Sequence, residues 1–350
     1  MNDQKRFHAI TRFIVPVVFL AFIFLCSRIP LLAEAYMHYC YPVIATILSY
    51  LTHWVPFSLL DVLIILAIAT FLAGIVMMCI RRLSVRCWAN ILLLSVLWLV
   101  VWFYMTWGIG YFRLDFHQRF AVDRATEDKD FFEAFVIRYI DSLNHAYIAE
   151  PQFDINEIDH AIETMYEKYH QQLQLPYPCG KRHTKRTLTE PLMTRMGVAG
   201  YFDPFFNEVQ VNNFLLPVSY PFTLAHEKAH QFGIASESEC NLYASIVCTS
   251  SHHPLVRYSG YMQTVSYLLG SLRRMVPDEY KEITARIDPR VIADFRRIEK
   301  HWKDALNPKL SAVQDKVYDS YLKTNKQQSG IRSYSEMVEL LLAWENMKKD

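Results

Sequence analysis

Long apolar runs set the first third of the chain apart from the rest. Residues 13–107 carry very few charged side chains, whereas residues 113–350 hold most of the lysine, arginine, aspartate and glutamate. A helix that crosses a bilayer needs about 20 mainly apolar residues. Three runs come close to that length, and they predict transmembrane helices at about 10–27, 59–80 and 88–107, which together form a membrane domain over residues 1–107.

Basic residues predict how these three spans are oriented. One group precedes the first span and a second group lies between the second and third, namely Lys5, Arg6 and Arg12, then Arg81, Arg82 and Arg86. Because basic loops stay in the cytoplasm, we expect Cys87 inside and everything after the third span outside. A cleaved signal peptide is the alternative for the first span, since Ala33-Glu34-Ala35 resembles a cleavage site.

Residues 31–54, between the first two spans, are apolar and aromatic and contain Pro42. A segment of this kind is typical of a helix that lies in the membrane interface, here on the outer face. A re-entrant segment is the alternative. In either case the lipid bilayer is a predicted partner of the chain.

The second part of the chain, residues 108–350, predicts one helix-dominated domain with a small β element. Apolar residues recur at helical spacing over 126–173, and the chain after Pro221 is helical almost to its end. The stretch between is rich in proline and glycine, and its alternating run 208–212 predicts a short strand. The basic run 181–186 is expected to be a solvated loop, with substrate docking or lipid contact as the alternative.

Composition excludes several functional classes. The formal net charge is +1, which argues against a nucleic-acid partner because a polyanion requires a basic excess. The chain has ten glycines and no glycine-rich phosphate loop. Its seven cysteines include no C-x-x-C pair and show no spacing typical of a disulfide framework, so we interpret them as small buried apolar residues.

The strongest chemical pattern is the segment FTLAHEKAHQFG at 222–233. Residues four apart share one face of a helix, so His226 and His230 can present two imidazoles to one zinc ion. Glu227 lies about 100° further round the helix, where it can take the proton of a water attacking a carbonyl and deliver it to the leaving amine. The pattern predicts a zinc-dependent peptidase that uses zinc-activated water, with Glu227 as general base.

A catalytic zinc site usually has a third protein ligand. Ser236 is a poor ligand, but it fits the N-cap of a helix that begins at Glu237. Glu237 and Glu239 would lie about 200° apart on that helix, so only one of them can face the ion. Asn241 shares a face with Glu237 and can brace a histidine by a hydrogen bond. We therefore expect Glu237 to be the third ligand, with Asn241 supporting the site and Glu239 as the alternative ligand.

Further motifs are spread over most of the chain: Pro56-Phe57-Ser58-Leu59, the run from Trp107 to Arg113, Gly200-Tyr201-Phe202-Asp203-Pro204, the histidine motif itself, Glu237-x-Glu239-x-Asn241 and Arg257-Tyr258-Ser259. Through them the sequence resembles the bacterial membrane proteins of domain-of-unknown-function family 3810. The resemblance implies a gluzincin-like fold of the HExxH peptidase superfamily and a location in the bacterial cytoplasmic membrane. It implies no known substrate. By analogy with related peptidases, Tyr258 is a candidate to polarise a substrate carbonyl, with core packing as the alternative.

Two functional hypotheses from different classes follow from these patterns. The first is a membrane-anchored zinc metallopeptidase that cleaves a peptide or protein outside the cytoplasmic membrane. The second is a non-catalytic membrane module that uses the zinc-binding helices structurally or as a sensor. Glu227 separates the two, because a structural site has no use for a general base. A transporter is disfavoured because the spans contain no paired charges.

Overall fold

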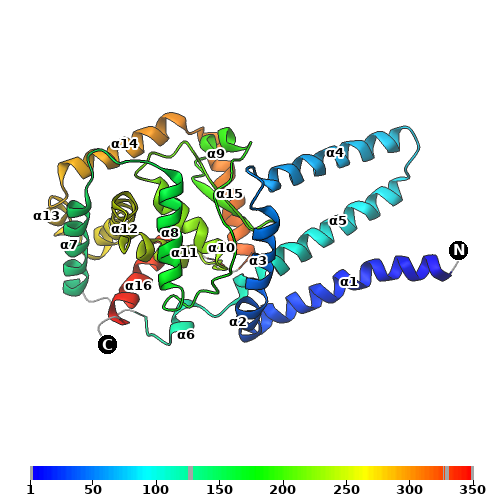
Figure 1. Cartoon of the computed structure of the whole chain (residues 1–350), viewed down its shortest axis with the longest axis horizontal. Helices are drawn as coiled ribbons and strands as arrows, with labels where there is room; N and C mark the ends of the chain where they lie inside the picture. The colour runs from blue at the N-terminus through cyan, green and yellow to red at the C-terminus, as the bar shows by residue number, and fades with distance from the viewer. Residues whose placement is uncertain (1–2, 125–128, 326, 328–330, 348–350) are drawn as a thin grey trace. The chain divides into compact units, whose positions relative to one another are not determined.

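The fold of the chain was obtained as a computed structural model, which describes residues 3–124, 129–325, 327 and 331–347. Within these ranges it contains sixteen α-helices, one short 3₁₀ helix and a two-stranded sheet, so the predicted mainly helical fold is confirmed (Figure 1). The elements are α1 (Asp3–Arg28), α2 (Pro30–Tyr39), α3 (Tyr41–Thr52), α4 (Leu59–Cys79), α5 (Val85–Thr106), η1 (Gly108–Phe112), α6 (Phe116–Phe120), α7 (Lys129–Ala146), α8 (Ile155–Tyr169), α9 (Glu190–Met196), β1 (Gly200–Asp203), β2 (Glu208–Val211), α10 (Tyr220–Gln231), α11 (Glu237–Thr249), α12 (Pro254–Met275), α13 (Tyr280–Thr284), α14 (Pro289–Ala305), α15 (Pro308–Thr324) and α16 (Ile331–Met347).

The chain divides into two compact units. Unit 1 comprises Met1–Leu114 with two later segments, Pro178–Leu188 and Asp203–Glu208. Unit 2 comprises Asp115–Tyr177, Thr189–Phe202 and Val209–Asp350. A division at residue 107, as expected from the sequence, therefore leaves out the two later segments that belong to unit 1.

Unit 1 contains the apolar helices. Helices α4 and α5 are long and apolar enough to cross a membrane, and they coincide with the second and third predicted spans. Ser58 and Ser84 cap their N-termini by accepting hydrogen bonds from the backbone N–H groups of Asp61 and Cys87. The first predicted span, at about 10–27, lies within α1, which ends at Arg28, and α2 then leaves at an angle of 115°. The described part of the chain thus has two candidate spans, or three if the bent pair of α1 and α2 is one.

Residues 31–54 form two helices, α2 and α3, rather than the single interfacial helix expected. Pro30 and Pro42 stand at their first turns, where proline is tolerated because the N–H is not needed. Several large apolar side chains of this region are exposed: Leu31, Tyr39, Val43, Ile47, Tyr50, Leu51 and Trp54. An exposed apolar surface of this kind is consistent with contact with lipid, which remains a prediction.

The basic segment 181–186 is not simply a solvated loop. Lys185 is buried, and its Nζ lies 2.6 Å from Glu208 Oε1 and 2.6 Å from the carbonyl oxygen of Thr52. The other oxygen of Glu208 accepts a hydrogen bond from the N–H of Leu59 at the start of α4. The expectation of full solvation was therefore wrong for Lys185, since a buried ammonium needs a paired carboxylate.

Unit 2 is organised around α10, α11 and α12, which bury most of their side chains. Helix α11 packs against α8, α10, α12 and α16. The two apolar stripes predicted over 126–173 face this core, and α7 buries Phe132, Phe135, Val136 and Ile140 there, while α8 buries Ile158, Ile162 and Met165. The packing holds α10 and the start of α11 side by side, and both elements carry candidate site residues.

The β element is a hairpin of β1 and β2, close to the predicted strand. Its second strand is buried at all four positions, so the alternation in the sequence does not separate an exposed from a buried face. Asn212, just after β2, is fully buried and hydrogen-bonds to Thr194 and to the carbonyl of Val198. This asparagine holds the loop before β1 in place.

Candidate metal centre

Helix α10 carries the two motif histidines and is held at both ends. Pro221 stands in its first turn, and the N–H of Phe222 donates a 3.1 Å hydrogen bond to the hydroxyl of Ser259 on α12. Past its C-terminus, Gly233 has φ +91°, a left-handed conformation that glycine adopts without a Cβ penalty. Ten of the twelve residues of α10 are buried, so the helix is fixed in its rotation about its own axis.

The rings of His226 and His230 lie one turn apart, with centroids separated by 4.9 Å. His226 Nδ1 is 2.9 Å from the side-chain oxygen of Asn241, and His230 Nδ1 is 2.8 Å from the carbonyl oxygen of Ile234. Both partners are acceptors, so each Nδ1 donates, and a ring that loses its second proton keeps the lone pair on Nε2. A histidine that binds a metal through Nε2 requires this tautomer.

Glu237, the first residue of α11, brings a carboxylate to the same point. Its Oε2 is 3.2 Å from His226 Nε2, and its Oε1 is 3.5 Å from His230 Nε2. The three side chains can offer one ligand atom each within 4.8 Å of one another. Burial alone would raise the pKa of Glu237, but the two imidazoles hold it well below its ordinary value. Two imidazoles and an ionised carboxylate form a donor set suited to a divalent metal ion.

Glu227 lies beside this cluster and is 6% exposed. Burial raises the pKa of its carboxyl group, while His226 and His230 oppose the rise. The backbone of β1 passes close to the carboxylate. A Cβ added at Gly200 would lie 3.0 Å from Glu227 Cγ and 3.1 Å from its Oε1. The position therefore favours glycine, because a larger residue would press on the candidate general base.

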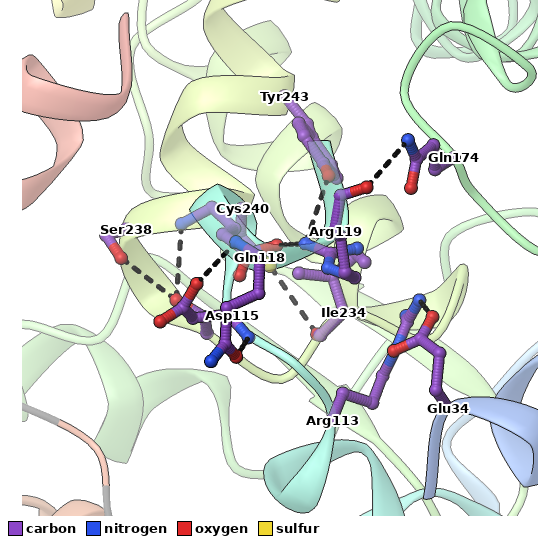
Figure 2. Close-up of polar contacts among 12 residues, drawn as sticks. Glu34, Arg113, Asp115, Gln118, Arg119, Gln174, Ile234, Ser238, Cys240 and Tyr243 are labelled. Atoms are coloured by element: carbon purple, nitrogen blue, oxygen red, sulfur yellow. Dashed lines mark hydrogen bonds and ion pairs between the residues drawn. The ribbon is translucent and has the colours of Figure 1, made fainter. Parts of the chain in front are cut away.

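Glu239, the alternative third ligand, points elsewhere. It forms an ion pair with Arg119 of α6, and both side chains are buried. Arg119 also reaches the hydroxyl of Tyr243, and its carbonyl accepts a hydrogen bond from Gln174 (Figure 2). The geometry brings Glu237 and not Glu239 to the two histidines, because Glu239 pairs with Arg119 instead.

Asn241 occupies the position expected for a supporting residue. Besides facing His226, its Oδ1 accepts a 3.1 Å hydrogen bond from the hydroxyl of Tyr267 on α12. Two donors thus converge on one oxygen, which fixes the amide so that its oxygen faces the imidazole. Since α11 carries both Asn241 and Glu237, one helix supplies a candidate ligand and the brace of another.

Tyr258 belongs to the core rather than to this cluster. Its side chain is fully buried, and its hydroxyl donates a 2.7 Å hydrogen bond to Asp294 on α14. The ring packs edge-on against Tyr147. Among the described residues, the contacts of Tyr258 lead away from Glu227 and the histidines, which favours the core-packing interpretation.

A different tyrosine, not anticipated from the sequence, does reach the cluster. The hydroxyl of Tyr318 on α15 donates a 2.6 Å hydrogen bond to Glu237 Oε1. The two residues are 81 positions apart, and α15 has no motif that would have identified it.

Lys228, inside the histidine motif, was also unassigned by the sequence. It is buried, and its Nζ lies 2.6 Å from Glu163 and 3.0 Å from Asp159 on α8. Tyr177 donates a hydrogen bond to Glu163 as well. The lysine therefore ties the metal-site helix to α8 and points away from the histidines that flank it in sequence.

Comparison with known proteins identifies a family. The sequence model of the family described as "Protein of unknown function (DUF3810)" matches residues 36–342. No curated protein and no solved structure matches the chain significantly. The matched range includes α4, α5 and every residue of the candidate metal centre.

Proposed function

The chain belongs to the DUF3810 family, whose description assigns no function, and on that premise we propose that it is a membrane-anchored zinc metallopeptidase. The proposal rests on one observation above all. His226, His230 and Glu237 converge within 4.8 Å, while the buried carboxylate of Glu227 lies beside them. A gluzincin-like architecture for unit 2 is part of the same proposal.

The donor set fits zinc better than the other common metal ions. Zinc accepts histidine nitrogen and carboxylate oxygen together in sites with three protein ligands, whereas calcium and magnesium prefer oxygen alone. His226, His230 and Glu237 would hold the ion. A zinc ion bound there would act as a Lewis acid and lower the pKa of a water molecule towards 7.

The chain's own groups would carry the proton transfers. The carboxylate of Glu227 accepts the proton of the attacking water and passes it to the amine that leaves when the peptide bond breaks. Burial of Glu227 strengthens this role, because electrostatic interactions are larger where bulk water is excluded. Asn241 keeps His226 in the required tautomer, and the Ile234 carbonyl does the same for His230.

Membrane association positions this activity. Helices α4 and α5 would anchor the chain, with α1 and α2 as a third span if the bent pair crosses together. By the distribution of basic residues, the loop that holds Arg81, Arg82 and Arg86 lies in the cytoplasm. Unit 2 would then face the outer side of a bacterial cytoplasmic membrane, where its substrate is a peptide or protein.

The test compares cells that produce the wild-type chain with cells that produce Glu227→Gln. Gln keeps the size of the side chain but cannot accept the proton, so the variant should keep zinc and lose nearly all turnover. New peptide N-termini outside the cytoplasm should appear only with the wild type. Identical N-termini in both strains would favour the alternative of a non-catalytic module.

A further inference from the structure

Helix α15 contacts the candidate metal centre although it contributes little to the core. Leu322 is the one side chain that α15 buries, and Val313 and Val317 are 59% and 65% exposed. Leu322 also lies outside the apolar cluster that forms the centre of unit 2 in the described part of the chain. By contrast, α10 buries ten residues. A helix with so little buried apolar surface can open locally at small cost.

The N-terminal end of α15 is attached to α9. The backbone N–H of Asn307 donates a 2.9 Å hydrogen bond to the carbonyl of Arg195 in α9, and α9 is the main packing partner of α15. The side chain of Leu306 lies against Gly197, where an added Cβ would approach it to 2.9 Å. These contacts attach the N-terminal end of α15, and the buried Leu322 attaches its last turn.

Tyr318 makes the contact between this helix and the candidate metal centre. It lies eleven residues beyond Asn307, which at 1.5 Å per residue is about 16 Å along the helix. Tyr318 is 39% exposed as a residue, and its hydroxyl donates a 2.6 Å hydrogen bond to Glu237 Oε1. A hydrogen bond to a carboxylate is among the stronger ones in proteins.

We propose that α15 is a closing element for the metal centre, latched by the hydrogen bond from Tyr318 to Glu237. This inference rests on the proposed function, because it takes Glu237 to be a metal ligand. A carboxylate that binds a metal through one oxygen keeps the other free to accept a hydrogen bond, and such a bond orients the ligand. Tyr318 is thus a positioning residue for Glu237. The hydrogen bond between them forms when α15 is in its closed position.

Coupling between the metal and α15 follows from thermodynamic linkage. If the closed helix orients Glu237 for the metal, then a bound metal must stabilise the closed helix by the same free energy. If α15 opened, one side of the metal centre would be uncovered and a substrate could enter. The hydrogen bond from Tyr318 to Glu237 would be broken in that open state. In this proposal α15 controls the access of a substrate to the site that binds the metal.

The experiment measures zinc affinity and amide hydrogen exchange on the full-length chain in detergent. Zinc affinity is taken from competition with a chelator, and exchange is followed in the peptides of α15 with and without zinc. The variants are Tyr318→Phe, which removes only the hydroxyl, and Tyr321→Phe as a matched control. Tyr321 lies on the same helix, and its ring stacks on Tyr318 at 6.3 Å.

We expect zinc to slow exchange in the α15 peptides of the wild type. Tyr318→Phe should lower zinc affinity about 10-fold and abolish the zinc-dependent protection of α15, while Tyr321→Phe should change neither. Zinc binding that is equally tight with and without the Tyr318 hydroxyl overturns the latch and leaves the metal site intact. Zinc that protects α10 and α11 but not α15 also overturns it. A wild-type chain that binds no zinc removes the proposed function and the latch together.

Discussion

At the residue scale, two glutamates two positions apart in α11 have opposite surroundings. Glu237 faces His226 and His230, whereas Glu239 pairs with Arg119. Residues two apart on a helix are rotated by about 200°, which accounts for the difference. The first is placed to bind a metal ion, and the second fastens α11 to α6.

This difference predicts distinct effects of the two alanine variants. Glu237→Ala should lower zinc affinity strongly with little loss of stability, since it removes a ligand at a partly exposed position. Glu239→Ala should leave Arg119 buried without its charge partner, which costs about 3–5 kcal/mol of unfolding free energy, while zinc affinity stays nearly unchanged. Asn241→Ala should lower zinc affinity about 10–100-fold.

Zinc content after dialysis against a graded chelator, together with the midpoint of thermal unfolding, separates these outcomes. Glu237→Gln serves as a control for Glu237→Ala, because it removes the charge of the carboxylate while keeping the volume of the side chain. Loss of the metal from Glu239→Ala before Glu237→Ala would exchange the roles assigned to the two carboxylates.

The sequence predicted the local part of this site and missed the distant part. The spacing of His226 and His230 follows from one helical turn, and Glu237 follows from the next helix start, so both depend on short-range geometry. Tyr318 and Arg119 reach the same region from 81 and 120 positions away. Which distant side chain meets α11 is decided by how the helices pack, and one sequence does not contain that information in any local pattern.

At the scale of elements, the setting of α10 depends on α8. Lys228 pairs with Asp159 and Glu163, and the hydroxyl of Tyr166 donates a 2.6 Å hydrogen bond to the carbonyl of Ala225. Both contacts come from α8, one meeting α10 just before His226 and the other between His226 and His230. They fix the rotation of α10 and with it the direction of both imidazoles.

Lys228→Met should therefore destabilise the chain by about 3–5 kcal/mol, because two neighbouring carboxylates lose the ammonium that lies between them. Adding Glu163→Gln should restore part of that loss, since the remaining charge is smaller and Tyr177 keeps an acceptor. A double-mutant cycle on the unfolding free energy measures the coupling. Additive effects of the two substitutions would contradict the buried ion pair.

The break between α1 and α2 shows a limit of hydropathy. Hydropathy separates the span at 10–27 from the segment at 31–54, and in the structure α1 ends at Arg28 and α2 begins at Pro30. Proline disfavours the helical conformation in the residue before it, here Ile29, which has ψ 88°. The position of the bend was thus readable from Pro30. Its angle of 115° was not, because the packing of α2 against α1, α3 and η1 sets it.

At the scale of the whole molecule, unit 1 combines apolar helices with a small buried polar cluster. Asp203 is fully buried there, and burial raises its pKa to about 7, with Glu208 adding to the rise and the Phe205 N–H and Lys185 opposing it. The native state then holds a proton that the unfolded chain releases near pH 4. Stability should consequently fall as pH rises from about 4 to 7, and the loss is complete above the folded pKa.

Asp203→Asn should remove this dependence. The amide oxygen can still accept the 2.9 Å hydrogen bond from Phe205 N–H without a charge to desolvate. At pH 8 the variant should be more stable than the wild type by roughly 1–4 kcal/mol, and the two should converge near pH 4. Thermal unfolding midpoints in detergent between pH 4 and 8 measure this. A variant less stable than the wild type at pH 8 would show that the ionised carboxylate is stabilising.

The central claim is that His226, His230 and Glu237 hold one zinc ion, and the zinc content of the purified full-length chain tests it most directly. After dialysis without chelator, we predict one zinc per chain in the wild type and in Glu227→Gln, and almost none in His230→Ala. His252→Ala, at an exposed histidine away from the site, serves as the control and should keep its zinc. A folded wild-type chain without stoichiometric zinc, or a His230→Ala variant that keeps it, would contradict the account.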